Sequence, residues 1–546
     1  MLSYRKLAMR VLGRPLNTGG GIDLPRPASQ RAAAFILTAA MLTTLAAPAF
    51  AGTWYIEDGD ITVKAGETEG TNKVSQGANQ EVEDTDTIIK NREDKASSNT
   101  VTIETNDKND KVEVTLKDVN IDTSSRNNAA VSVTGSGNTT IKLDGDNALK
   151  SDTYRSGIYG SGSLTISGGE NDSLTAQGGS GADGIYSSGS LTISGGTVTA
   201  NGDDGGRGIY SRGGVTISGG STVTANGGSG TISGGDGICS SGGVTISGGS
   251  TVTANGGNGG SIGGGSGIYS NGSVTISGGT VTANGGKGGS GYGGDGIRSS
   301  SGGVTISGGT VTANGGNSTN SSGGYGISSL DVAISSGTVT ANGGDSKDGY
   351  GGDGIHSNDI DLSGSLELTA KAGSPNGKAL SQNGRELDLD TIKDKLGPGA
   401  KVTATDANGE TKQVSIPRPV EPEGPVIPEE SSSSSGGGSA APSAPAFSLP
   451  GLTVTDKDGQ RISYTSTQSG NTLTVCVGRL TASFRISLAA LRQLRAEGIE
   501  TITFQTILCS TTLSVDELLA MGGEDAEVVL THHIRSSTLT VGGKAV

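Results

Sequence analysis

Tyrosine recurs at one fixed position in a repeated part of the chain, and its side chain has chemistry to offer there. A tyrosine ring has an apolar face and a polar tip, which suits it to stacking on sugar rings. Tyrosine is also common on solvent-facing strands, so a purely structural role is the alternative. The row predicts a carbohydrate-binding platform in the N-terminal half of the repeats. Each of its members follows the isoleucine of a Gly-Ile pair: Tyr159, Tyr186, Tyr210 and Tyr269.

Aspartate stands two residues before the same isoleucine in every second repeat. If the repeats stack ~4.8 Å apart, skipping one repeat separates the carboxylates by ~9.6 Å and reduces their repulsion. Asp-Gly is also ordinary turn chemistry. The functional alternative is a cation site, because calcium accepts carboxylates together with loop carbonyls. We therefore name Ca²⁺ as a candidate cofactor, with these candidate ligands: Asp183, Asp236, Asp295 and Asp353.

These rows are carried by repeats of 24 to 30 residues. Each repeat runs from Gly-Ile through Val-Thr-Ile-Ser-Gly-Gly and Thr-Val-Thr-Ala-Asn-Gly-Gly to a glycine-rich loop. A period in this range indicates stacked units, each too small to bury its own core. The isoleucines that mark the repeats are Ile158, Ile185, Ile209, Ile238, Ile268, Ile297, Ile327 and Ile355.

Apolar and polar residues alternate within each repeat, as they do in half-buried strands. Val215 and Ile217 are expected to point inward and Thr216 outward, and Val223 and Ala225 inward. Glycine and β-branched residues make a helix unfavourable. Equivalent strands of successive repeats can pair in parallel and bury their apolar side chains together. The predicted fold is therefore all-β, a parallel β-helix.

Asparagine occupies one position in six successive repeats. Stacked amides can hydrogen-bond along a solenoid, so we expect a structural ladder here. The glycine-rich loops lengthen after Asn226 and are expected to lie along one edge, where solenoids often bind ligands. The ladder positions are Asn201, Asn226, Asn255, Asn284, Asn314 and Asn342, with Gln177 in the preceding repeat.

Composition changes mark the expected domain organisation. Trp54 is expected to cover the N-terminal end of the solenoid, where strand edges would otherwise face water. The C-terminal part has an ordinary globular composition, with strands expected at 473–477, 481–486, 501–505 and 528–531 and helices at 488–497 and 515–519. The predicted segments are a signal peptide (1–51), a parallel β-helix (52–415, with irregular coils 52–150, regular coils 151–365 and closing coils 366–415), a disordered Pro/Ser/Gly linker (416–446) and a small α+β domain (447–546).

The charge balance excludes some partners. The chain of 546 residues has a formal net charge of −15, and without residues 1–51 it holds 33 basic and 53 acidic residues, a charge of −20. A chain this acidic is a poor partner for nucleic acid and for anionic membranes. Glycine accounts for 97 residues, but a strict three-residue period is missing, so collagen is excluded.

The N-terminal region indicates export. A basic segment, an apolar stretch from Ala32 to Leu45 and Ala49-Phe50-Ala51 form a secretory signal pattern. A membrane anchor is the alternative, although the apolar run is short for a span. We expect a secreted or extracellular protein without a membrane span in its mature form. Three cysteines do not make a disulfide framework, and pairing of Cys476 with Cys509 stays open.

The repeats resemble a family of secreted bacterial carbohydrate-binding β-helix proteins. The resemblance covers roughly residues 100–390 and is carried by the phrase from Gly352 to Asp359 and by Leu191-Thr192-Ile193-Ser194-Gly195-Gly196 and its copies. These proteins are non-catalytic relatives, in shape, of pectate lyases. The resemblance implies a right-handed parallel β-helix that binds calcium and plant cell-wall polysaccharide. Arg207, Ser266 and Tyr325 depart from the family's Asp-Gly-Ile position and interrupt a calcium row.

Two other functions remain open. A polysaccharide lyase would need acidic cation ligands and a base for proton abstraction. The nearest approach to such a group is Arg207 and Arg212 with Asp203 and Asp204, which assembles no acid–base pair, so we expect no catalysis. Alternatively, the array is an extracellular spacer or adhesin on the bacterial surface, and the C-terminal domain binds a cell-surface protein.

Overall fold

The computed structural model describes residues 51–417 and most of 452–545, with short gaps at 457–459, 463, 470, 478, 480, 497, 507–509, 522–525, 534–536 and 543. The chain divides into two compact units. The predicted signal peptide up to residue 50, most of the predicted linker, residues 447–451 and Cys509 lie outside the described residues. Among the described residues, no helix is both long and apolar enough to cross a bilayer.

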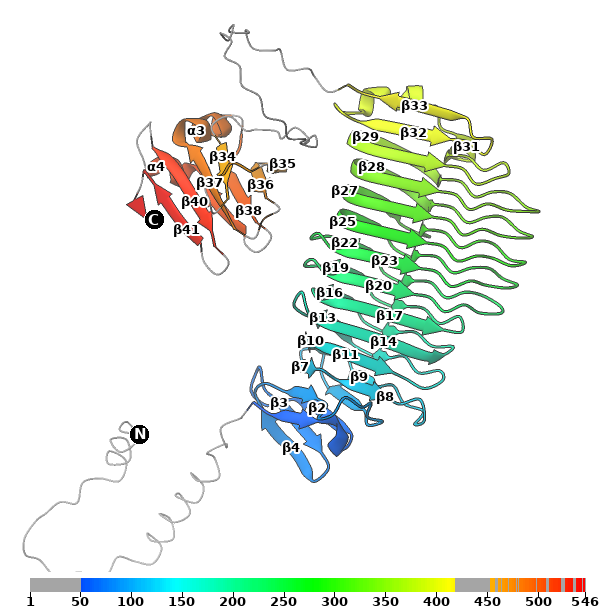
Figure 1. The fold of residues 1–546 in the computed structure, drawn as a ribbon, viewed down its shortest axis with the longest axis vertical. Helices are drawn as coiled ribbons and strands as arrows, with labels where there is room; N and C mark the ends of the chain where they lie inside the picture. The colour runs from blue at the N-terminus through cyan, green and yellow to red at the C-terminus, as the bar shows by residue number, and fades with distance from the viewer. Residues whose placement is uncertain are drawn as a thin grey trace, which may run out of the picture. The chain divides into compact units, whose positions relative to one another are not determined.

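The first unit is a parallel β-helix of about 13 turns, as predicted. A typical coil consists of β18 (Ile209–Ser211), β19 (Val215–Ser218) and β20 (Thr222–Asn226). Each strand pairs in parallel with its equivalents in the coils before and after it, so the strands stack along the solenoid (Figure 1). Residues one coil apart therefore sit directly beside each other, and any repeated side chain forms a column.

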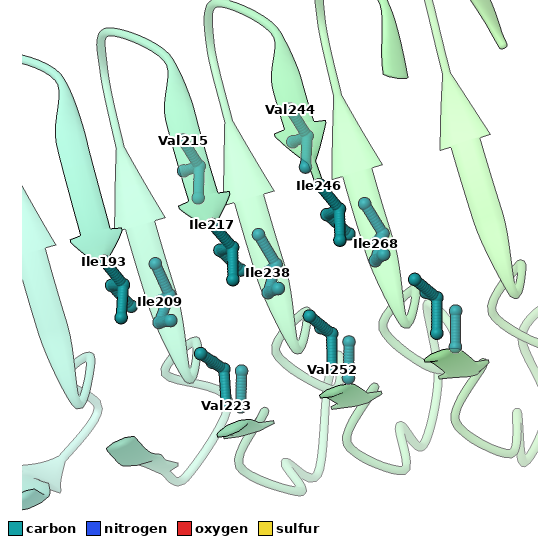
Figure 2. Packing of buried hydrophobic residues seen from close by; sticks show 14 of the residues in the cluster. Ile193, Ile209, Val215, Ile217, Val223, Ile238, Val244, Ile246, Val252 and Ile268 are labelled. Atoms are coloured by element: carbon teal, nitrogen blue, oxygen red, sulfur yellow. The ribbon is translucent and has the colours of Figure 1, made fainter. Parts of the chain in front are cut away.

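The core is made of columns of small apolar side chains. Val215, Ile217, Val223 and Ala225 are buried while Thr216 is partly exposed, as the alternation predicts. Figure 2 shows isoleucine and valine from successive coils in columns, pointing into the space between the strands. Burying each such side chain contributes about 1.5–3 kcal/mol, and only the neighbouring coils can supply the cover.

The regular coils begin at residue 158. Their corners turn at glycines such as Gly249 (φ +73°) and Gly279 (φ +85°), in a region that side-chain-bearing residues avoid. In the earlier coils the strands on the two sides of this corner are separate. From Val274 on they form one continuous strand in each coil. The remaining strands are β12 (Ile158–Gly160), β13 (Ser163–Ser167), β14 (Ser173–Ser180), β15 (Ile185–Ser187), β16 (Leu191–Ser194), β17 (Thr197–Asp203), β21 (Ile238–Ser240), β22 (Val244–Ile246), β23 (Thr251–Asn255), β24 (Ile268–Ser270), β25 (Val274–Asn284), β26 (Ile297–Ser299), β27 (Gly303–Asn314), β28 (Ile327–Asn342) and β29 (Ile355–Lys371).

The N-terminal end departs from the expected irregular coils. Strands β2, β3 and β4 form an antiparallel ribbon, and β2 also pairs in parallel with β6 of the solenoid. The Trp54 indole is buried and donates to Asp84 Oδ2 at 2.7 Å. The elements are β1 (Thr53–Tyr55), η1 (Ile56–Asp58), β2 (Ile61–Ala65), β3 (Asn72–Gln76), β4 (Asn79–Asp84), β5 (Ile88–Lys90), β6 (Val101–Thr105), β7 (Lys111–Lys117), β8 (Asn120–Asp122), β9 (Val131–Gly135), β10 (Asn138–Asp144) and β11 (Asp146–Lys150).

A hairpin and a short 3₁₀ helix close the other end of the solenoid. Strand β32 (Lys401–Thr405) pairs in parallel with β29 and antiparallel with β33 (Thr411–Ser415). Leu389 and Ile392 of η2 (Leu389–Lys395) join the core. Strands β30 (Leu380–Gln382) and β31 (Arg385–Glu386) form a second, smaller antiparallel pair. Antiparallel edges thus stand at both ends, where a parallel stack would otherwise leave its edge open.

Two polar ladders bind the coils together. The predicted asparagine ladder is present: each Nδ2 donates to the Oδ1 of the preceding asparagine at 2.8 Å, from Asn226 through Asn342. Gln177 stays outside the ladder and bonds Gly178 O. A second ladder, not predicted, consists of buried serines after the Gly-Ile pair, each bonding a carbonyl of the preceding coil. Its members include Ser187, Ser211, Ser240, Ser270, Ser299 and Ser329.

The glycine-rich loops stack on one side of the solenoid, as expected (Figure 1). Their glycines form a zigzag chain of backbone hydrogen bonds of 2.7–2.9 Å, which we call the glycine zipper. Successive bonds of the chain join, in turn, the segment that leaves the solenoid and the segment that returns to it, in one loop after another. These segments lie so close together that a Cβ atom on either would clash with neighbouring backbone. The zipper runs through Gly206, Gly228, Gly235, Gly257, Gly265, Gly286, Gly294, Gly316, Gly324, Gly344, Gly352 and Gly373.

The second unit has its own core and two sheets. Helix α3 (Leu488–Ala496) begins at Ser487, whose Oγ accepts from Ala490 N at 3.1 Å, and ends before Gly498 (φ +92°). The other helix is α4 (Val515–Ala520). One sheet holds β34 (Leu452–Thr455), β37 (Ala482–Ser487), β40 (Glu527–His532), β41 (Ser537–Val541) and β42 (Lys544–Ala545); the other holds β35 (Thr465–Ser469), β36 (Thr472–Cys476), β38 (Thr501–Gln505) and β39 (Ser510–Ser514).

Candidate functional site

Both predicted rows lie on the face formed by the strands that start at the Gly-Ile isoleucines. The residue after each isoleucine belongs to the tyrosine column, and the residue two before it belongs to the aspartate column. Residues of the two columns touch within a coil: the Arg207 guanidinium lies 4.2 Å from the Tyr210 ring centre, and His356 Nδ1 lies 2.7 Å from Asp353 Oδ2. The two columns therefore make one continuous strip, which we call the column face.

Tyr159 and Tyr186 stack at the N-terminal end of this face. Their ring centres are 5.2 Å apart and their planes differ by 2°. Tyr159 is 41% exposed. Its strand partner in the preceding coil is Ser132, which has a small side chain. The aromatic stack of this column therefore ends at Tyr159.

A surface pocket of about 430 Å³ lies against this end of the stack. Tyr159, Tyr186 and Ser132 line it together with Tyr154 and Arg155. The sequence analysis did not assign Tyr154 to the site, because it precedes the repeated pattern. The structure places it there through a left-handed backbone conformation (φ +58°), and its side chain is 79% exposed. The pocket falls within the size range of ligand sites and combines aromatic rings with polar groups.

The other two predicted tyrosines do not extend this platform. Tyr210 meets Tyr186 edge-on, with the planes at 71°, and the Arg207 guanidinium covers its ring. Tyr269 is separated from Tyr210 by Cys239, whose small side chain is buried on the same face near Asp236 and Arg207. The Tyr269 hydroxyl donates to Asn271 Oδ1 at 2.9 Å. The four residues share one column, and of these four Tyr159 and Tyr186 line the pocket described above.

The predicted aspartates join successive coils. In each, Oδ1 accepts a hydrogen bond of 2.7–2.8 Å from the backbone N–H at the equivalent position of the next coil. The aspartate lies in one coil and the N–H donor in the next. One aspartate in every second coil is therefore enough to link each such pair of coils. The donor residues are Arg207, Ser266, Tyr325 and Lys378, at the positions where the aspartate pattern is interrupted.

Burial controls the electrostatics of these carboxyl groups. It raises the pKa of the Asp183, Asp236 and Asp295 carboxyls, because the low-dielectric surroundings disfavour the charged form. Burial also raises the pKa of the neighbouring Cys239 thiol to about 12, so the thiol is protonated at neutral pH and unreactive. The charged partners are Arg207 near Asp236 (3.8 Å) and Arg298 near Asp295 (3.5 Å).

This arrangement gives the calcium prediction no support. One oxygen of each aspartate is taken by a backbone N–H, and the four carboxylates are spread over alternate coils. Within the described parts of both units, no three acidic, histidine or cysteine side chains gather as a metal-binding group. Calcium would have to rely on carbonyls or water for most of its ligands. Calcium binding stays a prediction.

The group considered for a lyase is not assembled around Arg207. Its Nε lies 3.8 Å from Asp236 Oδ2, and its guanidinium rests on Tyr210. Asp203 and Asp204 are exposed, and Asp204 Oδ2 accepts from Ser180 Oγ at 3.3 Å. Arg207 thus belongs to the column face rather than to a cluster with these two acids.

Comparison with known proteins agrees with the coil structure. The family model described as Beta helix repeat matches residues 191–209, 274–297, 304–329 and 332–359, all within the regular coils. No curated protein and no solved structure matches the chain. The matched segments are the stacked strands that carry the column face. These segments match the β-helix repeat model, and the first unit has the parallel β-helix fold.

Proposed function

We propose that this protein is a secreted, non-catalytic carbohydrate-binding protein, and that the Tyr159–Tyr186 pocket holds a sugar ring of a polysaccharide. The observation that carries the proposal is the stacked, partly exposed pair Tyr159 and Tyr186, which lines a pocket of about 430 Å³. An apolar ring face covers the C–H surface of a sugar, while Arg155 and neighbouring hydroxyl groups donate to its oxygens. The repeats supply a stiff scaffold that holds these groups in place without a ligand.

The test is glycan binding by the mature chain, measured by retention on immobilised pectin and cellulose and by calorimetry with soluble fragments. Tyr159→Ala removes the exposed ring and should weaken binding about tenfold or more, the effect of an aromatic anchor in a binding site. Tyr269→Ala is the matched control, because Tyr269 lies in the same column away from the pocket. Equal loss in both variants, or none in either, contradicts the pocket assignment. Because the proposed protein is non-catalytic, the chain length of the glycan should not change during incubation with it.

Calcium is tested in the same assay. Chelator should abolish binding if calcium bridges an acidic polysaccharide to the protein, and the joint change Asp236→Asn and Asp295→Asn should do the same. Binding that persists under both conditions rules calcium out as a cofactor of this site. Export is tested by N-terminal sequencing of extracellular protein, which should begin after Ala51.

A spacer or adhesin is the second candidate function. The separate core and sheets of the C-terminal unit favour it, because a unit of this kind can bind a partner on its own. In that case the full chain attaches to cells, Tyr159→Ala has no effect, and deletion of residues 447–546 abolishes attachment.

A further inference from the structure

A second group of ring and charged side chains stands near the C-terminal end of the column face. Arg298 and His356 belong to the tyrosine column, and Tyr325 belongs to the aspartate column. They come from three successive coils, so strand pairing brings them together. The Tyr325 and His356 rings stack with centres 4.4 Å apart and planes 12° apart. The sequence analysis treated Tyr325 only as a break in the aspartate pattern.

Two buried carboxylates hold this group from below. Asp353 Oδ2 lies 2.7 Å from His356 Nδ1, and Asp295 Oδ2 lies 3.5 Å from Arg298 Nη1. The aspartate side chains are 9% and 7% exposed, while those of His356 and Arg298 are 38% and 51% exposed. The negative groups therefore face inward and the nitrogen-bearing groups face the solvent.

The Arg298 guanidinium presents hydrogen-bond donors to the solvent. The second oxygens of the two carboxylates already accept backbone N–H groups, from Tyr325 at 2.8 Å and from Lys378 at 2.7 Å. A guanidinium has five N–H donors and no acceptor, and only one of its nitrogens faces Asp295. Such a site favours a ligand group that only accepts, such as a carboxylate or a sulfate.

Arginine is concentrated on this face of an otherwise acidic protein. Residues 151–365 contain four arginines, Arg155, Arg207, Arg212 and Arg298. Arg155 lines the tyrosine pocket, Arg207 covers Tyr210, and Arg298 stands in the second group. The Ile158 and Ile355 strands are seven coil steps apart, or ~34 Å at ~4.8 Å per step. One extended glycan chain can span that distance.

We propose that Arg298, Tyr325 and His356 form a second subsite, which binds an anionic substituent, a carboxylate or sulfate, of the glycan held at the tyrosine pocket. This inference rests on the proposed function and adds the chemical class of the glycan. Two subsites on one rigid face raise the affinity for a long chain, because the second contact forms within the complex. The Arg298 guanidinium supplies positive charge to the anionic group, so this contact does not require a bridging cation.

The binding experiment uses the mature chain with a polyuronate, a sulfated galactan and a neutral β-glucan of similar length. The variant carrying Arg298→Gln and His356→Gln should bind the polyuronate or the sulfated galactan at least about tenfold more weakly, the effect of losing charge-assisted hydrogen bonds. Its affinity for the neutral glucan should not change. Arg212→Gln is the matched control, an exposed arginine of the same array that should leave all affinities unchanged. The two anionic arms show which substituent is preferred.

A second measurement separates this inference from the proposed function. Inorganic sulfate and galacturonate are titrated into the protein while the imidazole NMR signals are followed, with His356 assigned by His356→Gln. A saturable shift of the His356 signal that Arg298→Gln removes supports the subsite even if no polysaccharide binds. No such shift, or equal binding of anionic and neutral glycans by wild type and the double variant, overturns it. If Tyr159→Ala leaves glycan binding unchanged while the His356 response is intact, the tyrosine pocket is contradicted and the anion subsite stands.

Discussion

Close approach of backbones explains why single glycines cannot be replaced along the zipper. A Cβ atom at Gly294 would lie 1.9 Å from the carbonyl oxygen of Gly265, which is backbone and cannot rotate away. The hydrogen bond from Gly294 N to Gly286 O holds the same residue from the other side. Glycine is required here by space, whereas at the corner residue Gly249, where a Cβ would meet nothing within 4 Å, it is required by the left-handed φ.

The change Gly294→Ala should lower the free energy of unfolding of the β-helix by about 1–3 kcal/mol or more, because the loop legs must separate. Gly278→Ala is the matched control: its Cβ would meet nothing within 4 Å, so its effect should be small. Urea denaturation followed by circular dichroism measures both. A similar cost for the two variants would contradict the close-packing explanation.

The Asp295 carboxyl links stability to pH. Burial raises its pKa in the folded protein above the unfolded value of about 3.9. The folded state therefore binds the proton more tightly, and this group's contribution to stability is fully present below pH ~3.9 and is lost as pH rises through the folded pKa. Relative to Asp295→Asn, which keeps an acceptor for the Tyr325 N–H, wild type should lose stability as the pH rises above about 4. Urea denaturation of both proteins at several pH values checks this, and a constant difference would contradict it.

At the scale of elements, each coil depends on the neighbouring coils for its strand pairing. Strands β18, β19 and β20 have no partner within their own coil and pair only with equivalents above and below. The asparagine ladder, the serine ladder and the aspartates also form their hydrogen bonds between neighbouring coils. Every interior rung has two neighbours and every terminal rung has one.

The asparagine ladder therefore predicts a position-dependent cost. Asn284→Ala removes two amide hydrogen bonds, to Asn255 and from Asn314, while Asn342→Ala removes one, to Asn314. At about 1 kcal/mol for each net hydrogen bond, the interior change should cost about twice the terminal one. Chemical denaturation of the two variants measures the ratio. A larger cost at Asn342 would show that the ladder does not act as a chain of equal rungs.

At the scale of the whole molecule, the two units have separate cores. The β-helix core runs without interruption from Trp54 to Val414, and the second core is built around the Phe484 and Phe504 rings, whose centres lie 4.7 Å apart. Repeat arrays are stabilised mainly by neighbouring coils, and small domains unfold as one unit. The chain should therefore unfold in two steps.

Phe484→Ala tests this division. It removes a fully buried ring and should destabilise the C-terminal unit by about 3–5 kcal/mol. Only one of the two calorimetric transitions should move to lower temperature, and the transition of the β-helix should stay in place. The core change Ile276→Ala is the reciprocal control, and a shift of both transitions by either change would contradict separate cores.

Much of the fold follows from the sequence because its signals are local and repeated. The alternation in Val215-Thr216-Ile217 determines which side chains point inward, and the constant step between Gly-Ile pairs determines that equivalent residues align. Ser487 and Gly498 likewise mark the ends of α3 by capping chemistry that involves only nearby residues. The antiparallel ribbon at residues 61–84 was missed because strand direction depends on the partner, which alternation alone does not specify.

The candidate site depended on contacts between coils. The sequence alone determined that Tyr159, Tyr186, Tyr210 and Tyr269 share a column and that the aspartates alternate. The tertiary structure decided that Arg207 covers Tyr210, that Cys239 is buried, and that Tyr325 stacks on His356. The physical reason is that the repeat period assigns each residue to a column, whereas side-chain packing against the coils above and below decides which surfaces stay free to bind.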